Sequence, residues 1–140
     1  MRPPTGAVPP ASAHLDEGEP LDLVALASEV CRRYRQEFPD EQGRYGEASI
    51  AWCVHDHQYV LYWAVEAADG YLDMHREVAW LARVLEARDF PLSRLARSLD
   101  IGADVVLGQV GGVAGRRLSD VLVNAAAFVR SRDTFLDGTR

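Results

Sequence analysis

The stretch that decides the fold is WCVHDHQYVLYW, residues 52–63, in which four polar residues interrupt an apolar and aromatic run. It lies within residues 47–68, the most apolar segment of the chain, which Gly70 ends. At about 100° per residue, His55 and Gln58 fall on the same side as the other polar residues of this segment. We therefore predict a central helix over residues 47–68, with His55 and Gln58 facing solvent.

The remaining two polar residues of the stretch, Asp56 and His57, flank the apolar side of that helix. Each is turned by roughly 50° from the centre of this side, so we expect both to be largely buried. Since adjacent helical residues diverge, each needs a partner of its own, and Tyr34 or an arginine of the predicted helix over residues 20–38 is the candidate for Asp56. The pair predicts either a buried polar network that fixes helix register or the polar wall of a pocket.

Four further segments carry apolar residues at spacings of three and four, as amphipathic helices do. They are residues 20–38, which Asp22 or Pro20 opens, residues 71–88, the segment after Pro91, and residues 116–136. Strand-like alternation is scarce, and short connectors favour antiparallel neighbours. The predicted fold class is all-α, a four- to five-helix bundle with a disordered N-terminal tail.

The composition along the chain divides it into four parts. Residues 1–19 are rich in Pro, Ala, Gly and acids, and we expect a flexible tail because they bury too little to offset their ordering entropy. Residues 20–110 form the predicted core bundle, in which Gly102 indicates a close helix crossing. The Gly-rich residues 111–115 are the predicted hinge of the amphipathic helix 116–136, which docks in cis or swaps between chains.

Length, charge and cysteine content restrict the class of protein. A chain of 140 residues suits one domain, and a net charge of −6 argues against nucleic-acid binding, which needs a basic face. No run reaches the roughly 20 apolar residues of a membrane span, and no signal-peptide pattern is present. Cys31 and Cys53 show neither a CxxC nor a zinc spacing, so we expect buried free thiols and a cytoplasmic protein.

Three stretches of the chain, in order, carry a resemblance to a known family. They are RYRQEFPDEQGRYG (33–46), CVHDHQYVLYWAVEAADG (53–70) and EVAWLARVLEARDFPLSRLARSL (77–99). Together they resemble the N-terminal helical, cap-like region of bacterial cobalamin-binding-domain regulatory proteins, over most of residues 24–108. The resemblance implies a stand-alone helical module of regulatory type.

In the photoreceptor branch of that family, a tryptophan and a Glu-His pair cover the upper face of cobalamin. Trp63 and His75 have a similar separation in this chain, with Met74 in place of the glutamate. The resemblance thus implies cobalamin or another tetrapyrrole as the cofactor to consider. The DxHxxG-type loop of the cobalamin-binding domain itself is absent from the chain.

Aromatic residues follow one face of the predicted central helix. Core packing is the ordinary explanation, but rings of this kind next to polar groups also wall pockets for flat ligands. The candidate pocket residues are Asp56, His57, Tyr59, Trp63 and His75.

Signatures of catalysis and of metal binding are missing from the sequence. Di-iron bundles supply a Glu-x-x-His pair from each of two helices, whereas His55, His57 and His75 each lack a glutamate three positions before. No histidine follows His75 to serve as a proximal haem ligand. No nucleophile elbow or phosphate loop is present either. We therefore predict a protein that is not an enzyme, with no catalytic residue and no metal ligand.

Trp80 lies on the polar side of its predicted helix, beside Arg76 and Arg83. Either a terminal helix covers it, or it marks an interface, where tryptophan and arginine are enriched. Leu118 and Leu122 of the last helix complete the candidate interface. We expect a non-enzymatic regulatory or protein-interaction module that self-associates or binds a protein partner. The alternative is a sensor of a small tetrapyrrole-like or aromatic ligand.

Overall fold

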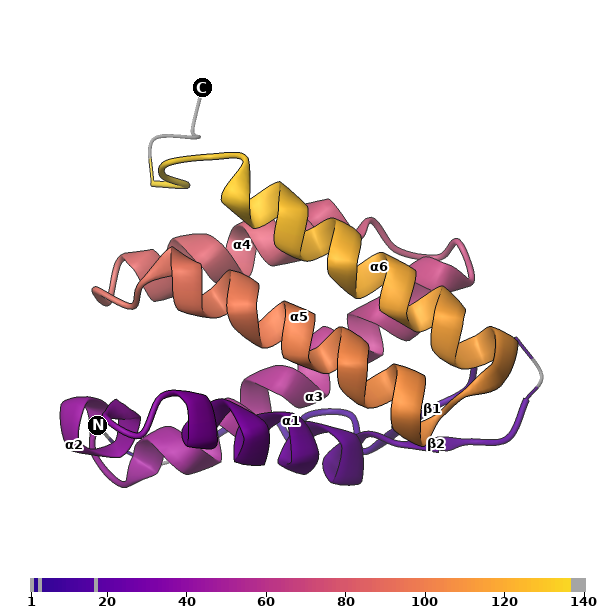
Figure 1. The fold of residues 1–140 in the computed structure, drawn as a ribbon, viewed down its shortest axis with the longest axis horizontal. Coiled ribbons are helices and arrows are strands. Elements are labelled where there is room, and N and C mark those ends of the chain that lie inside the picture. Colours follow the sequence, from indigo (N-terminus) through magenta and orange to yellow (C-terminus); the bar gives the residue numbers. More distant parts are fainter. Residues whose placement is uncertain (1, 3, 17, 137–140) are drawn as a thin grey trace.

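The computed structural model describes residues 2, 4–16 and 18–136, and within them six helices and one short pair of strands (Figure 1). The elements are β1 (Ser12–Ala13), β2 (Leu21–Asp22), α1 (Leu23–Glu37), α2 (Glu41–Tyr45), α3 (Ala48–Ala68), α4 (Met74–Glu86), α5 (Leu92–Gln109) and α6 (Gly112–Arg130). The predicted all-α bundle is confirmed. No helix in the described part of the chain is long and apolar enough to cross a membrane.

Side-chain caps and glycines set the ends of several helices. The Asp22 carboxylate accepts the backbone N–H of Ala25 at 3.0 Å, so Asp22 rather than Pro20 opens α1. Asp73 caps α4 in the same way through the N–H of Arg76. Beyond α3, Gly70 adopts a φ of +84°, which side chains disfavour and glycine tolerates.

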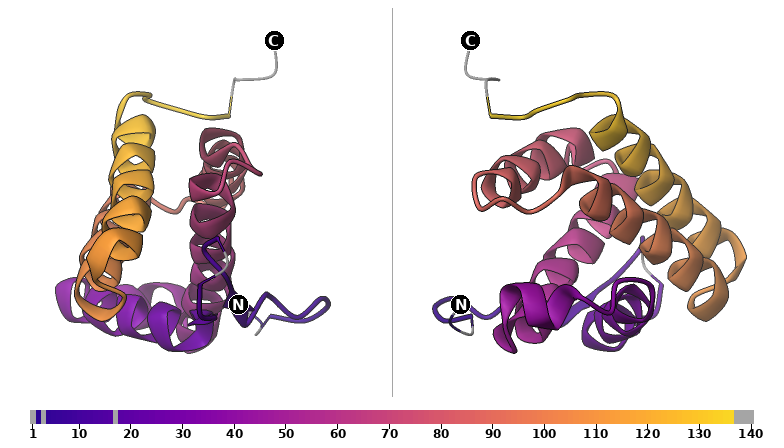
Figure 2. Two further views of the ribbon diagram at one scale, coloured as in Figure 1. Left: turned by 90° about the vertical axis from the view of Figure 1, so that its right-hand side faces the viewer. Right: turned by 60° about the vertical axis from the view of Figure 1, so that its left-hand side comes forward.

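α3 lies at the centre of the bundle, as its apolar sequence predicts. It packs against α1, α2, α4 and α6. α5 and α6 form a hairpin on one side, α3 and α4 stand on the other, and α1 lies across the base (Figure 2). The helices bury between them the side chains of Leu23 and Val30 of α1, Val60 and Val65 of α3, Val78 of α4, Leu99, Val105 and Val106 of α5, and Leu118, Leu122 and Val129 of α6, and Phe135 beyond α6 is buried as well.

The predicted Gly-rich hinge over residues 111–115 is wrong, because α6 already begins at Gly112 and ends at Arg130. Only Val110 and Gly111 separate α5 from α6, and Gly111 makes the turn with a φ of +69°. The C-terminal helix docks on its own chain. Leu118 and Leu122 are 2% and 0% exposed, so the structure places them in the core instead of at an interface.

The N-terminal segment is also more ordered than the predicted flexible tail. β1 and β2 pair antiparallel, and the side chains of Ala13 and Leu15 are buried. The segment crosses α3, where the Gln58 side-chain amide donates to the carbonyl of Pro10 at 3.1 Å. Gln58 is buried for this reason, and its predicted exposure to solvent is wrong.

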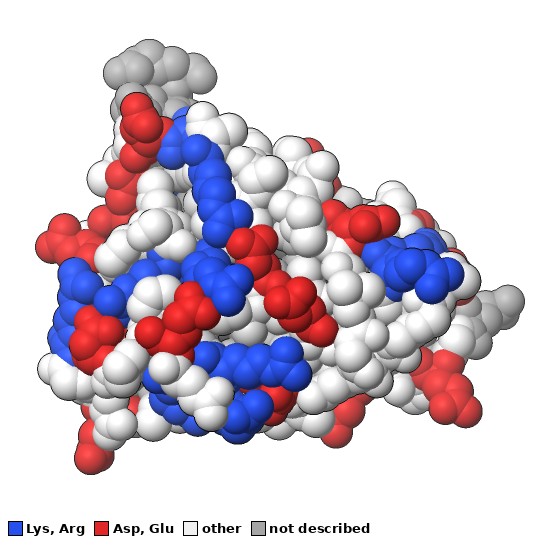
Figure 3. All heavy atoms as spheres, in the orientation of Figure 1, with Lys and Arg blue, Asp and Glu red and all other residues white. Residues whose placement is uncertain are grey.

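Ion pairs join α1 and α2 to α5. Arg94 of α5 binds Asp40 and Glu41, each at 2.8 Å, and Arg97 binds Glu37 at 2.6 Å. Basic and acidic side chains accordingly lie side by side over this face of the molecule (Figure 3). Exposed pairs of this kind contribute little to stability, whereas the mostly buried Arg94–Glu41 pair fixes the position of α2 against α5.

Substitution by alanine at two helical glycines, Gly102 and Gly115, should change the stability of the fold in opposite directions. A Cβ on Gly115 would lie 2.8 Å from the backbone oxygen of Val106, while a Cβ on Gly102 would meet Leu122 Cδ1 at an ordinary 3.5 Å. We expect Gly115→Ala to destabilise the fold by about 1–3 kcal/mol, because backbone must move. Gly102→Ala should be neutral or stabilise it by up to about 1 kcal/mol, through helix propensity. The close backbone approach thus lies at Gly115 and not at Gly102, where it was predicted. Urea unfolding of both variants measures this, and equal effects would contradict the close approach at Gly115.

Candidate functional site

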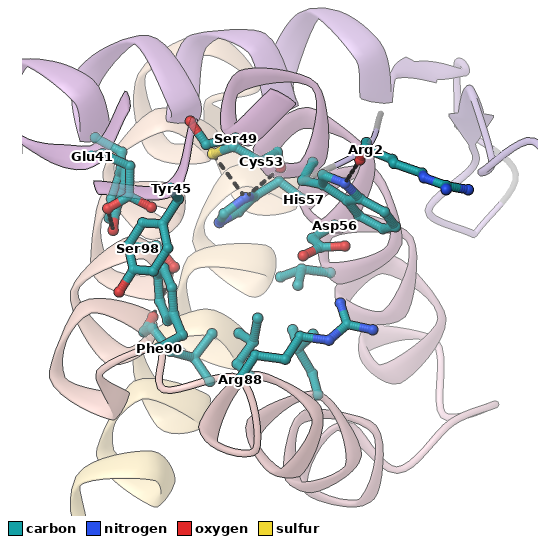
Figure 4. A pocket seen from close by; sticks show the side chains of 16 residues that line it. Arg2, Glu41, Tyr45, Ser49, Cys53, Asp56, His57, Arg88, Phe90 and Ser98 are labelled. Atoms are coloured by element: carbon teal, nitrogen blue, oxygen red, sulfur yellow. Dashed lines mark hydrogen bonds between the residues drawn. The ribbon is translucent and has the colours of Figure 1, made fainter. Parts of the chain in front are cut away.

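A cavity of about 350 Å³ lies between α1, α2, α3 and the α4–α5 corner (Figure 4). Its size falls within the range of small-molecule sites. Its apolar and aromatic wall is formed by Tyr34, Tyr45, Trp52, Cys53, Val60, Leu81, Leu85, Phe90 and Leu95. Its polar wall is formed by Arg2, Glu41, Ser49, Asp56, His57, Arg88 and Ser98.

His57 is the buried polar group at the centre of the cavity wall. Its side chain is 8% exposed and projects from α3 into the cavity (Figure 4). Nδ1 lies 2.9 Å from the carbonyl oxygen of Cys53, one turn earlier, so Nδ1 carries the proton and donates it. Burial lowers the pKa of His57, which keeps the ring neutral. Nε2 is then a bare acceptor, and it has no hydrogen-bond partner within the described residues.

Asp56 lies beside His57 on the same wall. Its carboxylate accepts from Nδ1 of His55 at 3.1 Å, so neither Tyr34 nor an arginine of α1 is its partner, contrary to prediction. Burial raises the pKa of Asp56, and the hydrogen bond from His55 offsets part of that rise. Arg88, from the corner after α4, stands on the same side of the cavity as Asp56 (Figure 4).

The opposite end of the cavity is a closed hydrogen-bonded network. Tyr34 donates its hydroxyl to Glu41 Oε1 at 2.9 Å, and Arg94 donates to the same oxygen at 2.8 Å. Burial, together with the bond to Glu41, raises the pKa of Tyr34, so the hydroxyl stays protonated. The polar groups at this end satisfy one another, so among the described wall residues Nε2 of His57 is the buried side-chain atom that has no hydrogen-bond partner.

A disulfide between Cys31 and Cys53 joins α1 to α3 at the edge of the cavity. The expectation that both cysteines are free thiols is therefore wrong for this structure. The two Cα atoms are 6.0 Å apart, a normal separation for such a bond. His57 Nδ1 lies 3.7 Å from the Cys31 sulfur and 3.6 Å from the Cys53 sulfur.

The five predicted pocket residues separate into three groups. Asp56 and His57 line the cavity, whereas Tyr59 and Trp63 line a neighbouring surface groove of about 820 Å³. The cavity and the groove share Trp52, Asp56, Leu81, Leu85 and Arg88. His75 lines neither space, because it stacks on Phe128 of α6 at 4.2 Å and hydrogen-bonds to Asn124 at 2.6 Å.

The candidate interface residues divide likewise. Trp80 is 52% exposed and covered by neither terminal helix, and it lines the groove with Arg76 and Arg83. Leu118 and Leu122 lie elsewhere, in the core.

The residues present do not fit a cobalamin cap. Trp63 is only 8% exposed and packs edge-on against Trp80, with ring centroids 6.5 Å apart. His75 faces α6 and shares no cavity with Trp63. The two residues that the resemblance pairs thus offer no common surface to a corrin ring.

Several residues of the cavity wall could not be predicted from the sequence pattern. Glu41 and Tyr45 belong to α2, a short helix in a stretch that reads as a connector, and Arg88 and Phe90 lie at the α4–α5 corner. For the disulfide at the edge of the cavity, the sequence offered one signal: Cys31 and Cys53 each lie among apolar residues of a predicted helix.

A search for similar proteins found no family model, no curated protein and no solved structure that matches this chain.

The disulfide predicts a measurable loss of stability on reduction. It closes a loop with a sequence separation of 22, for which chain entropy gives a stabilisation of about 3 kcal/mol. We expect reduction, or the double variant Cys31→Ala/Cys53→Ala, to lower the free energy of unfolding by about that amount in urea. The reductant should leave the double variant unchanged. Alkylation of both thiols in the folded, non-reduced protein would show that the bond is absent.

Proposed function

We propose that the protein is a small-molecule sensor, a helical regulatory module whose cavity binds a compact aromatic compound that carries an N–H or O–H donor. The observation that carries the proposal is the Nε2 atom of His57, a buried acceptor without a partner. Leaving such a group unsatisfied costs about 1–3 kcal/mol, and a ligand that donates to it relieves that cost.

The other walls favour an aromatic body for the ligand. Tyr45, Trp52 and Phe90 supply ring surface, and Val60, Leu81 and Leu85 supply aliphatic surface. A flat ring with one polar edge matches one acceptor set in a mainly apolar wall. The neutral state of His57 suits an uncharged donor such as an indole N–H or a phenol O–H.

Ligand binding in this cavity would affect the whole bundle. Its walls come from α1, α2, α3, α4 and α5, so a ligand there contacts five helices at once. A ligand that binds only the folded state stabilises it, by about 2.7 kcal/mol at one hundred times its dissociation constant. Such a change in rigidity is a signal that a regulatory module can transmit.

A pair of isosteric ligands tests the proposal. Indole carries an N–H that indene lacks, so we expect indole to bind the non-reduced protein about tenfold more tightly, as one satisfied buried acceptor predicts. Isothermal titration and thermal shift give both dissociation constants. His57→Leu should abolish the preference for indole. The matched control His75→Leu, a histidine outside the cavity, should retain it.

Two results would contradict the proposed role of His57. If indole and indene bind with equal affinity, or if neither raises the melting temperature at millimolar concentration, the Nε2 atom is not a recognition group. The variant Ser98→Leu adds a second check, because its larger side chain fills the cavity from α5 and should block indole.

Self-association is a second candidate function, favoured by the exposed Trp80. Trp80 is about half exposed to solvent, in a groove that Arg76 and Arg83 also line. Tryptophan and arginine are the residues that most often dominate binding energy at interfaces. A second copy of the chain, docked on the α3–α4 groove, is the occupant we propose.

Light scattering after size exclusion tests this second candidate. We expect a dimer for the wild type, and a shift toward monomer for Trp80→Ala because the proposed anchor is lost. Tyr71→Ala is the matched control, since Tyr71 is 80% exposed but lies outside the groove. A monomeric wild type at the highest attainable concentration would rule the dimer out.

A further inference from the structure

Three side chains that form metal sites in other proteins meet where α1 crosses α3. The sulfur atoms of Cys31 and Cys53 and a ring nitrogen of His57 all lie within 4.8 Å of one another. Thiolate sulfur and imidazole nitrogen are the donors that Zn²⁺ takes in tetrahedral sites. Cys53 and His57 also line the cavity, so an ion held by them would face an open space.

The spacing of the ligand atoms supports this. Tetrahedral Zn²⁺, with bonds of about 2.0–2.3 Å, holds nitrogen and sulfur ligand atoms about 3.6 Å apart. His57 Nδ1 lies 3.7 Å and 3.6 Å from the two sulfurs, which is this separation. The sulfur atoms must move, to about 3.8 Å apart on a shared ion. With Cα atoms 6.0 Å apart, rotation of the cysteine side chains can provide that movement. The imidazole must also turn, so that Nδ1 faces the ion instead of the Cys53 carbonyl.

We propose that the chain, once its disulfide is reduced, binds one Zn²⁺ ion through the Cys31 and Cys53 thiolates and Nδ1 of His57. The fourth coordination position is open to the cavity. The ion replaces the disulfide as the link between α1 and α3. The proposal goes beyond the binding of an aromatic ligand and does not rest on it, because that ligand uses the opposite nitrogen of the imidazole.

The chemistry balances with a dithiol as the reductant. The dithiol supplies two electrons and two protons, the bond between the Cys31 and Cys53 sulfurs breaks, and the dithiol becomes a cyclic disulfide. Two protein thiols result, and Zn²⁺ displaces both of their protons into solution. Nδ1 of His57 gives up its bond to the Cys53 carbonyl, and the ring proton moves to Nε2.

Metal titration of the two redox forms is the test. Co²⁺ serves as the probe because tetrahedral cobalt thiolates have charge-transfer and visible bands that report sulfur ligation. Reduced wild-type protein, freed of reductant under anaerobic conditions, should bind one Co²⁺ per chain, and Zn²⁺ should displace it. Non-reduced protein should show no such bands. Equal binding by the two forms, or none by the reduced form, would overturn the proposal.

Variants identify the nitrogen ligand. We expect His57→Gln to weaken Zn²⁺ binding to the reduced protein at least tenfold, and the control His75→Gln to leave it unchanged. In the wild type, ¹⁵N spectra of His57 should show the proton on Nδ1 before Zn²⁺ and on Nε2 after it. An unmoved proton, with cobalt bands present, would mean ligation by sulfur alone and would refute the three-ligand site even if His57→Gln does not fold.

The metal-site proposal and the aromatic-ligand proposal can be refuted by different results. Cys31→Ser removes one metal ligand but no cavity wall, because Cys31 does not line the cavity. This variant should lose the Co²⁺ bands and keep the preference for indole over indene. Absence of the preference in the non-reduced wild type, with the Co²⁺ bands present after its reduction, would refute the sensor alone.

Discussion

The contact of α1 with α3 is the constraint on which the rest of the molecule depends. α3 is the most apolar helix and touches most of the others, so its rotation about its own axis decides which side chains reach the core. The Cys31–Cys53 bond fixes that rotation at one level, and the bond from His57 Nδ1 to the Cys53 carbonyl orients the imidazole on α3. With this face set, His57 must lie on the cavity wall, and the groove side of α3 must carry Tyr59 and Trp63.

The periodicity of apolar residues predicted those features that are set within a single helix, namely the helices themselves and which of their residues are buried. The five long helices follow from apolar residues at spacings of three and four, and the burial of His57 follows from the helical angle alone. Gln58 shows where such reasoning stops. Its position on α3 is polar by angle, yet the N-terminal segment crosses that side and buries it with a hydrogen bond from Gln58 to Pro10.

The sequence pattern could not predict contacts that form between two or more segments of the chain. Trp63 and His75 are a plausible pair along the chain, but α4 turns His75 toward α6. Cys31 and Cys53 carry no motif, and only the crossing of α1 and α3 brings their sulfurs together. Glu41 enters the cavity through a helix too short to show a period. Tertiary contact, not local propensity, thus decides most of the candidate site.

The two nitrogens of His57 connect the two proposals through a single proton. In the disulfide form Nδ1 holds that proton, because the Cys53 carbonyl accepts it, and Nε2 presents a lone pair to the cavity. A metal ion at Nδ1 would place the proton on Nε2 and turn the same atom into a donor. The cavity would then favour a ligand with an acceptor, such as a carbonyl, over one with an N–H. The redox state of Cys31 and Cys53 would in this way select the class of ligand, without any rearrangement of the helices.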